Sequence, residues 1–142
     1  MKKIIFHLLF ILICFLSLSA HSQDEAILEE SSGSKVKIVS ITPPTPIALK
    51  DGETVTISAE VEYFLANPTG SLEVFVQSDD GESLLVNSTK SVQISNGKGL
   101  VTLSAEVLVK NTYSVHFMVA LYHNARQSTS VATQRSYVVN KL

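Results

Sequence analysis

The sequence predicts an all-β protein, a two-layer antiparallel sandwich of seven to eight strands without a disulfide. Apolar and polar residues alternate with a period of two over most of residues 35–139, and this period places successive side chains on opposite faces of a strand. Asp-Gly and Asn-Gly pairs, which supply the positive φ angles of tight turns, separate several of the alternating runs. Short strands with frequent turns are typical of sandwiches.

The first 22 residues are predicted to be a removable secretory signal. Basic MKK precedes the apolar run IIFHLLFILICFLSL, which as a helix would span roughly 22 Å and fall short of the ~30 Å bilayer core. Small residues predict cleavage after Ser22 or Ala20. An uncleaved anchor and a lipoprotein signal at Cys14 are the alternatives, and the second is disfavoured because Ile13 stands where a small residue is expected. We therefore expect export to the periplasm, the envelope or the exterior, without a membrane span after cleavage.

Residues 23–34, QDEAILEESSGS, are predicted to be a disordered acidic leader. Four carboxylates and a Ser/Gly-rich end occur without strand alternation, which favours a solvated tether over a cation site. Loss of the signal removes Lys2, Lys3 and the only cysteine, and leaves nine Lys and Arg against thirteen Asp and Glu, a net charge near −4. Such a chain is not expected to bind nucleic acid, and its domain must depend on core burial alone.

Eight strand segments are predicted within residues 35–142, which form the domain. The two most regular are 53–65 and 100–109, where apolar residues at odd positions alternate with Thr, Ser and Glu. One face of each strand is therefore expected to be buried and the other to be exposed to solvent. The remaining segments are 35–41, 71–77, 82–87, 90–95, 112–123 and 129–139.

Turn residues divide these segments. The Asx-Gly pairs at 80–81 and 96–97 predict hairpins over residues 71–87 and 90–109. Three prolines between residues 43 and 46 cannot donate ladder hydrogen bonds, so we expect the first strand at a sheet edge. A further turn is expected at 51–52 and a crossover loop at 67–70.

The segment SITPPTPIALKDGETVTISAEVEY is similar to the opening of many bacterial immunoglobulin-like modules, with an edge strand, a proline kink, Asp-Gly and a long alternating strand. Over residues 35–139 the predicted strands resemble an immunoglobulin-like or fibronectin type III-like β-sandwich. Tyr113 precedes inward Val115 by two residues, which is the offset of the tyrosine corner in that family. The chain departs from the antibody pattern because it lacks a cysteine pair and tryptophan. It also has Asn111 before Tyr113, where the antibody pattern prefers a small residue. The resemblance implies a fold and not a function.

No residue pattern predicts a catalytic centre, a cofactor or a metal site. His116 and His123 are seven residues apart on one predicted strand, hence on opposite faces and about 23 Å apart at ~3.3 Å per residue, too far to share a metal. The SDDGES segment at 78–83 lacks the ligand spacing of a calcium loop and is better explained as a hairpin turn. Residues 87–89 match a glycosylation acceptor, though a plain strand connection is favoured. An independent enzyme is the least favoured class.

The segment NTYSVHFMVALYH, residues 111–123, is predicted to be a strand with two partly apolar faces. One face supplies a complete core row, so the opposite face must point outward. The predicted core row is Tyr113, Val115, Phe117, Val119 and Leu121.

Phe75, Met118 and Tyr122 are predicted to form one apolar patch on the outer face of two adjacent strands, with His116 beside it. The alternatives are that these side chains lie singly, or that the apolar leader residues 26–28 cover them. If exposed, the patch would be a contact surface for a protein or a hydrophobic ligand.

Two classes of function remain open. The first is an exported, non-catalytic binding or assembly module that contacts an unknown protein or envelope component through this face or through inter-strand loops. The second is a secreted inhibitor or accessory domain of a hydrolase, which presents a loop. Carbohydrate binding belongs to the first class but is weakened by the lack of tryptophan. We expect a monomer that needs no cofactor.

Overall fold

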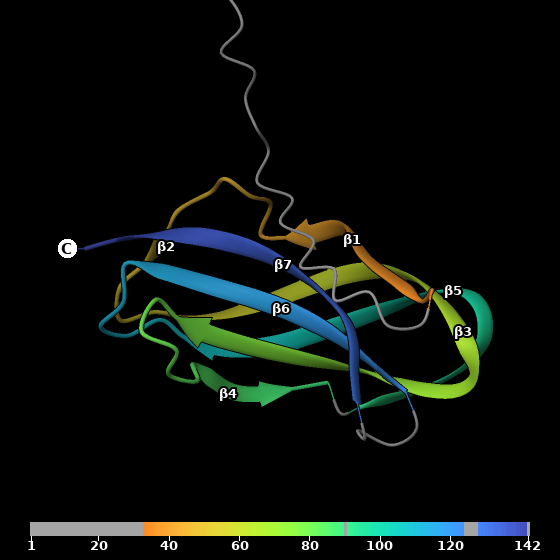
Figure 1. Cartoon of the computed structure of the whole chain (residues 1–142). Coiled ribbons are helices and arrows are strands. Elements are labelled where there is room, and N and C mark those ends of the chain that lie inside the picture. Colours follow the sequence, from red (N-terminus) through yellow and green to blue (C-terminus); the bar gives the residue numbers. More distant parts are fainter. Residues whose placement is uncertain (1–32, 90, 124–127, 142) are drawn as a thin grey trace, which may run out of the picture.

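The computed structural model describes residues 33–89, 91–123 and 128–141 (Figure 1). The predicted signal peptide lies outside the described residues, as does the leader except for Gly33 and Ser34. Across the described ranges there is no helix of the length and hydrophobicity that crossing a membrane requires. The strands are β1 (Lys35–Thr42), β2 (Leu49–Lys50), β3 (Thr54–Ser78), β4 (Leu85–Ser88), β5 (Val92–Leu108), β6 (Ser114–His123) and β7 (Ser128–Asn140).

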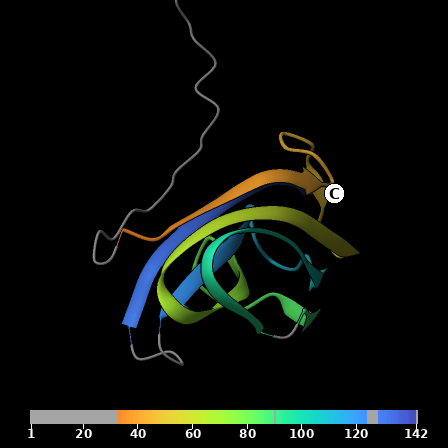
Figure 2. The ribbon, with the colours of Figure 1, turned by 90° about the vertical axis from the view of Figure 1, so that its right-hand side faces the viewer.

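Two long strands, β3 and β5, connect the layers of the fold. The first half of β3 pairs with β1 on one side and with β5 on the other, and β4 pairs with β5. The second half of β3 pairs with the start of β5 on one side and with β6 on the other, and β6 pairs in turn with β7. All strands thus belong to one hydrogen-bonded sheet, which curves around a common interior (Figure 2). The predicted all-β sandwich of seven to eight strands is confirmed, and its pairs are antiparallel except for the short β2–β7 pair.

The strand β3 runs without interruption through residues 67–70, so the crossover loop predicted there is wrong. The ladder between β3 and β5 instead shifts its register between Leu65 and Thr69. Such a bulge bends a strand and increases its twist. It also tolerates Pro68, which has no N–H to donate to a regular ladder. The strand β3 therefore passes from the layer that contains β1 into the layer that contains β6 and β7.

The strand β5 is also continuous, so the hairpin predicted at Asn96-Gly97 is wrong. Gly97 has the positive φ angle of a turn residue, 105°, but it lies beside the bulge of β3. The side-chain amide of Asn96 donates to the carbonyl oxygens of Leu65 (3.1 Å) and Ala66 (3.0 Å), and the backbone N–H of Ala66 donates to the hydroxyl of buried Ser34 at 3.0 Å. These side chains satisfy backbone groups that the bulge removes from the ladder.

The turn predicted at Asp80-Gly81 is confirmed. Gly81 has a φ angle of 85°, and the backbone N–H of Gly81 donates to the carbonyl of Ser78 at 3.1 Å. Next to the turn, Gln77 and Ser83 form an antiparallel bridge, and the backbone N–H of Leu84 donates to the carbonyl of Val76 at 2.9 Å. Beyond this bridge the chain forms β4, which pairs with β5, so the hairpin predicted over residues 71–87 holds only beside its turn. The turn predicted at 51–52 is likewise confirmed, with a φ angle of 83° at Gly52.

The inward-facing side chains of both layers form one hydrophobic core. The predicted core rows of β3, β5 and β6 are buried within it, apart from Val55, Tyr63 and Val101, which are partly buried, and Tyr113, which is exposed. Phe117 has no exposed surface. The largest fully buried side chains are Tyr137, Phe117, Ile38, Ile57, Leu65, Leu72, Leu103 and Leu121.

Tyr113 was predicted to face the core, and this prediction is wrong because its side chain is 70% exposed. Asn111 adopts a positive φ angle of 52° just before it, and the regular alternation of β6 begins only at Ser114. The ring of Tyr113 lies instead under the ammonium group of Lys141, 4.9 Å from its centroid. The tyrosine corner implied by the family resemblance is therefore absent at this residue.

Two side chains of β7 connect it to the first strand and the segment after it. The guanidinium of Arg135 donates to the carbonyl oxygen of Ile38 at 3.1 Å. The hydroxyl of Tyr137, a residue only 1% exposed, donates to the carbonyl oxygen of Pro43 at 2.7 Å. Burial raises the pKa of Tyr137 well above its usual range, and the nearby charge of Arg135 opposes this effect only in part.

We expect Tyr137→Phe to lower the free energy of unfolding by about 1–2 kcal/mol, because the carbonyl of Pro43 loses its donor.

The raised pKa of Tyr137 also predicts a loss of stability at high pH. Below pH ~10, the ordinary pKa of an unfolded tyrosine, the contribution of Tyr137 is complete. Above it the unfolded chain releases a proton that the folded chain retains, so stability falls. Urea unfolding at pH 8 and pH 11 should show a larger loss for the wild type than for Tyr137→Phe, and equal losses would contradict this account.

Candidate binding surface

Phe75 and Met118 lie side by side on the outer face of β3 and β6. They are direct partners in the antiparallel ladder, and their chain neighbours Val76 and Phe117 point into the core. Because side chains alternate along a strand, Phe75 and Met118 point outward. Both are partly exposed. The structure thus brings these two residues together as expected, while their role in binding stays a prediction.

Tyr122 lies on the same outer face and is also partly exposed, but it is separated from Phe75 and Met118. It is four residues from Met118, roughly 13 Å along the strand. The row between them consists of Glu73 on β3, Ala120 on β6 and Ala132 on β7. Phe75 and Met118 therefore form the apolar pair, with Tyr122 at a distance and not in one compact patch.

His116 is part of a hydrogen-bonded polar cluster in the row next to this pair. Its Nδ1 lies 2.9 Å from the hydroxyl of Ser136 and 3.1 Å from the amide nitrogen of Gln134, and its Nε2 lies 3.0 Å from the hydroxyl of Ser114. The amide nitrogen of Gln134 also donates to the hydroxyl of Ser136 at 3.0 Å. Since an amide nitrogen only donates, Nδ1 of His116 accepts, and its Nε2 carries the proton toward Ser114. The four side chains hold one another in place beside the apolar pair.

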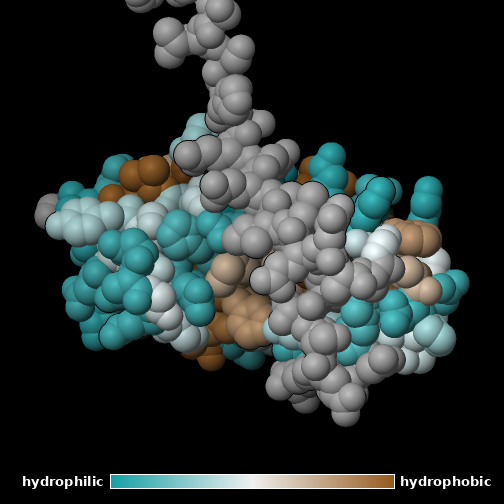
Figure 3. Space-filling view, in the orientation of Figure 1, coloured by the Kyte–Doolittle hydropathy of each residue, from teal (hydrophilic) through white to brown (hydrophobic). Residues whose placement is uncertain are grey.

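Figure 3 shows the molecule in the orientation of Figure 1, with some hydrophobic surface near the middle of the view and hydrophilic regions to the left and right. The polar cluster draws on two strands, since Ser114 and His116 belong to β6, and Gln134 and Ser136 to β7. Sequence reasoning identified only His116, although the alternation in TSVATQRSYVV already placed Gln134 and Ser136 on one face.

The acidic residues of the turn at 78–83 serve the structure of the turn. The carboxylate of Asp79 accepts hydrogen bonds from the hydroxyl of Thr112 and from the backbone N–H of Tyr113 at 3.1 Å. The bond from Thr112, followed by that from Tyr113, holds the pKa of Asp79 below its usual value. The hydroxyl of Ser78 donates to Asp80. Within the part of the chain that the structure describes, no group of three or more His, Cys, Asp or Glu could hold a metal ion.

The chain matches no protein-family model and no curated protein sequence. Among solved structures it is similar to the C-terminal domain of Wzt, with 12% sequence identity and a TM-score of 0.42. The match covers 83% of this chain and 80% of that chain. A similarity of this degree transfers neither fold nor ligand to this protein.

Proposed function

We propose that the protein is an exported, non-catalytic binding or assembly module, and that it contacts its partner through the outer face of β3, β6 and β7. One observation carries the proposal: the partly exposed apolar pair of Phe75 and Met118 lies directly beside the ordered polar cluster around His116. Protein interfaces combine an apolar centre with a polar rim in this way. The inward rows of the same strands are complete, so the core does not require these side chains.

The order of the strands supports the view that this module is of the immunoglobulin-like type. One layer has the order β1–β3–β5–β4, and the other β7–β6–β3, with the start of β5 paired to the second half of β3 and the short β2 paired to β7. If the two halves of β3 are counted separately, and the start of β5 and the short β2 are set aside, this is the arrangement of four and three strands found in constant-type immunoglobulin sandwiches. Folds of this class serve many unrelated functions, so the argument for binding rests on the face itself.

We propose a protein or a protein-containing envelope assembly as the partner. Met118 has a flexible, polarisable side chain that adapts to an apolar partner surface, and Phe75 adds a rigid ring. The secretory signal predicted over residues 1–22 supports a partner outside the cytoplasm. The absence of tryptophan argues against a saccharide platform.

Replacing Phe75 and Met118 together with Ser tests this proposal. We expect the free energy of unfolding to fall by no more than about 1 kcal/mol, since both side chains are on the surface. Retention of the partner from the envelope fraction of the native host should fall at least tenfold, the loss expected when a central apolar contact is removed.

The matched control is the double variant Val86→Ser and Leu108→Ser, which removes two exposed apolar side chains at a distance from this face. It should retain the partner as well as the wild type does. A partner that is retained by the Phe75/Met118 variant but lost by the control would place the binding surface elsewhere and refute the proposal.

A further inference from the structure

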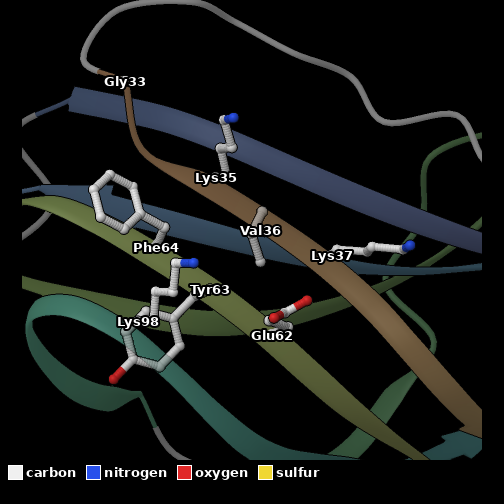
Figure 4. Close-up of a pocket in the computed structure, with 8 residues that line it drawn as sticks. All are labelled: Gly33, Lys35, Val36, Lys37, Glu62, Tyr63, Phe64 and Lys98. Atoms are coloured by element: carbon white, nitrogen blue, oxygen red, sulfur yellow. The ribbon is translucent and has the colours of Figure 1, made fainter.

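A groove with a volume of about 460 Å³ opens along β1, β3 and β5, away from the face discussed above (Figure 4). Its volume lies within the roughly 300–1,000 Å³ that small-molecule sites occupy. Three strands that are distant in sequence supply its walls. The side chains that matter for its chemistry are Lys35, Lys37, Glu62, Tyr63, Phe64 and Lys98.

Phe64 lies between two lysines in this groove. Lys35 on β1 and Lys98 on β5 are its direct partners in the two adjoining ladders, and Figure 4 shows all three side chains on one stretch of the sheet. Cross-strand partners have Cβ atoms about 4.5–5.5 Å apart, so both ammonium groups can reach a ligand that rests on the ring. The ring is accessible, since Phe64 is 37% exposed.

The groove is basic, whereas the chain as a whole carries a formal net charge of −2. Three lysines line it against one carboxylate, that of Glu62, which is the ladder partner of Lys37. All three lysines are exposed and add nothing to the core. A local cluster of positive charge on an otherwise acidic protein attracts anions, and the aromatic ring between two of the lysines offers a surface for the uncharged part of a ligand.

We propose that this groove binds a phosphate ester, with the phosphate between Lys35 and Lys98 and the organic part on the ring of Phe64. Lysine is a common phosphate ligand because its ammonium group is a compact charge with three donors. A phosphate monoester carries about −1.5 to −2 charges near neutral pH, which suits a groove with more cations than anions. Two sources share the phosphate ester group: a soluble sugar phosphate, which is a monoester, and the headgroup of a phospholipid, which is a diester with a single negative charge.

Binding measurements on the purified protein distinguish these sources. The probes are glucose 6-phosphate, inorganic phosphate, and vesicles of phosphatidylglycerol or of phosphatidylcholine. We expect saturable binding of glucose 6-phosphate or of phosphatidylglycerol vesicles, weaker at high salt because the groove is exposed to solvent. Binding of the first assigns a soluble ester, and binding of the second alone assigns a lipid headgroup.

Substitutions locate the binding. Lys98→Gln and Lys35→Gln should each weaken it at least fivefold, and Phe64→Leu should weaken ester binding more than binding of inorganic phosphate. Lys50→Gln, which removes an exposed lysine outside the groove, should leave binding unchanged. The proposal is overturned if no ester binds, if inorganic phosphate binds as tightly as the esters, or if Lys50→Gln weakens binding as much as Lys98→Gln.

Discussion

Phe117→Ala should lower the free energy of unfolding by roughly 3–5 kcal/mol, the largest effect that we expect from a single substitution. The side chain has no exposed surface, and it lies on β6 between the ladders to β3 and β7. Its removal therefore costs both the burial of a phenyl ring and the cavity that remains. Equilibrium unfolding in urea at neutral pH measures this loss.

Phe64→Ala is the matched control for this substitution. The same atoms are removed from a ring that is 37% exposed at the sheet surface, so we expect a loss of about 1 kcal/mol or less. If Phe117→Ala itself costs less than about 1 kcal/mol, the face assignment of β6 is reversed. Because the strand period is two, such an error would move every side chain of β6 to the opposite face.

Gly70→Ala should lower the free energy of unfolding by about 1–3 kcal/mol, the second largest effect. A Cβ atom at this position would lie 2.6 Å from the backbone oxygen of Tyr122 and 3.1 Å from a methyl carbon of Leu65. The oxygen belongs to β6, which pairs with β3 directly at Gly70. The clash is therefore relieved only if the strands separate at the bend.

Thr69→Ala is a suitable control because Thr69 is the exposed neighbour of Gly70 in the same strand. We expect its effect to stay within about 0.5 kcal/mol. Thermal unfolding of both variants provides the comparison. A Gly70→Ala protein as stable as the wild type would show that β3 and β6 are farther apart at the bend than the structure has them.

The period of two was enough to predict which side chains of the regular strands are buried. In the first half of β3 and the second half of β5 the odd-numbered apolar residues enter the core because alternation is a direct consequence of strand geometry. The predicted hairpin was wrong at a residue pair that is suited both to a tight turn and to a bulge. Asn96-Gly97 has turn chemistry, yet its positive φ angle and side-chain amide serve a bulge. Local sequence does not distinguish these uses, since both require the same backbone conformation.

The candidate site was predictable only as far as it depends on strand neighbours. The pairing of Phe75 with Met118 follows from strand order combined with alternation. The groove around Phe64 depends on exact register across two ladders, which brings Lys35 and Lys98 to opposite sides of one ring. Register is determined by the bulge and by long-range packing, and neither is encoded in a short stretch of chain.

Site-specific photocrosslinking from position 75 tests the central claim most directly, namely that the partner binds the outer face of β3, β6 and β7. A photoreactive phenylalanine analogue would replace Phe75 in the native host, and the same analogue would replace Val86, which is 57% exposed, as the control. Our account predicts a protein adduct from position 75 and none from position 86. An adduct from position 86 without one from position 75 would contradict it.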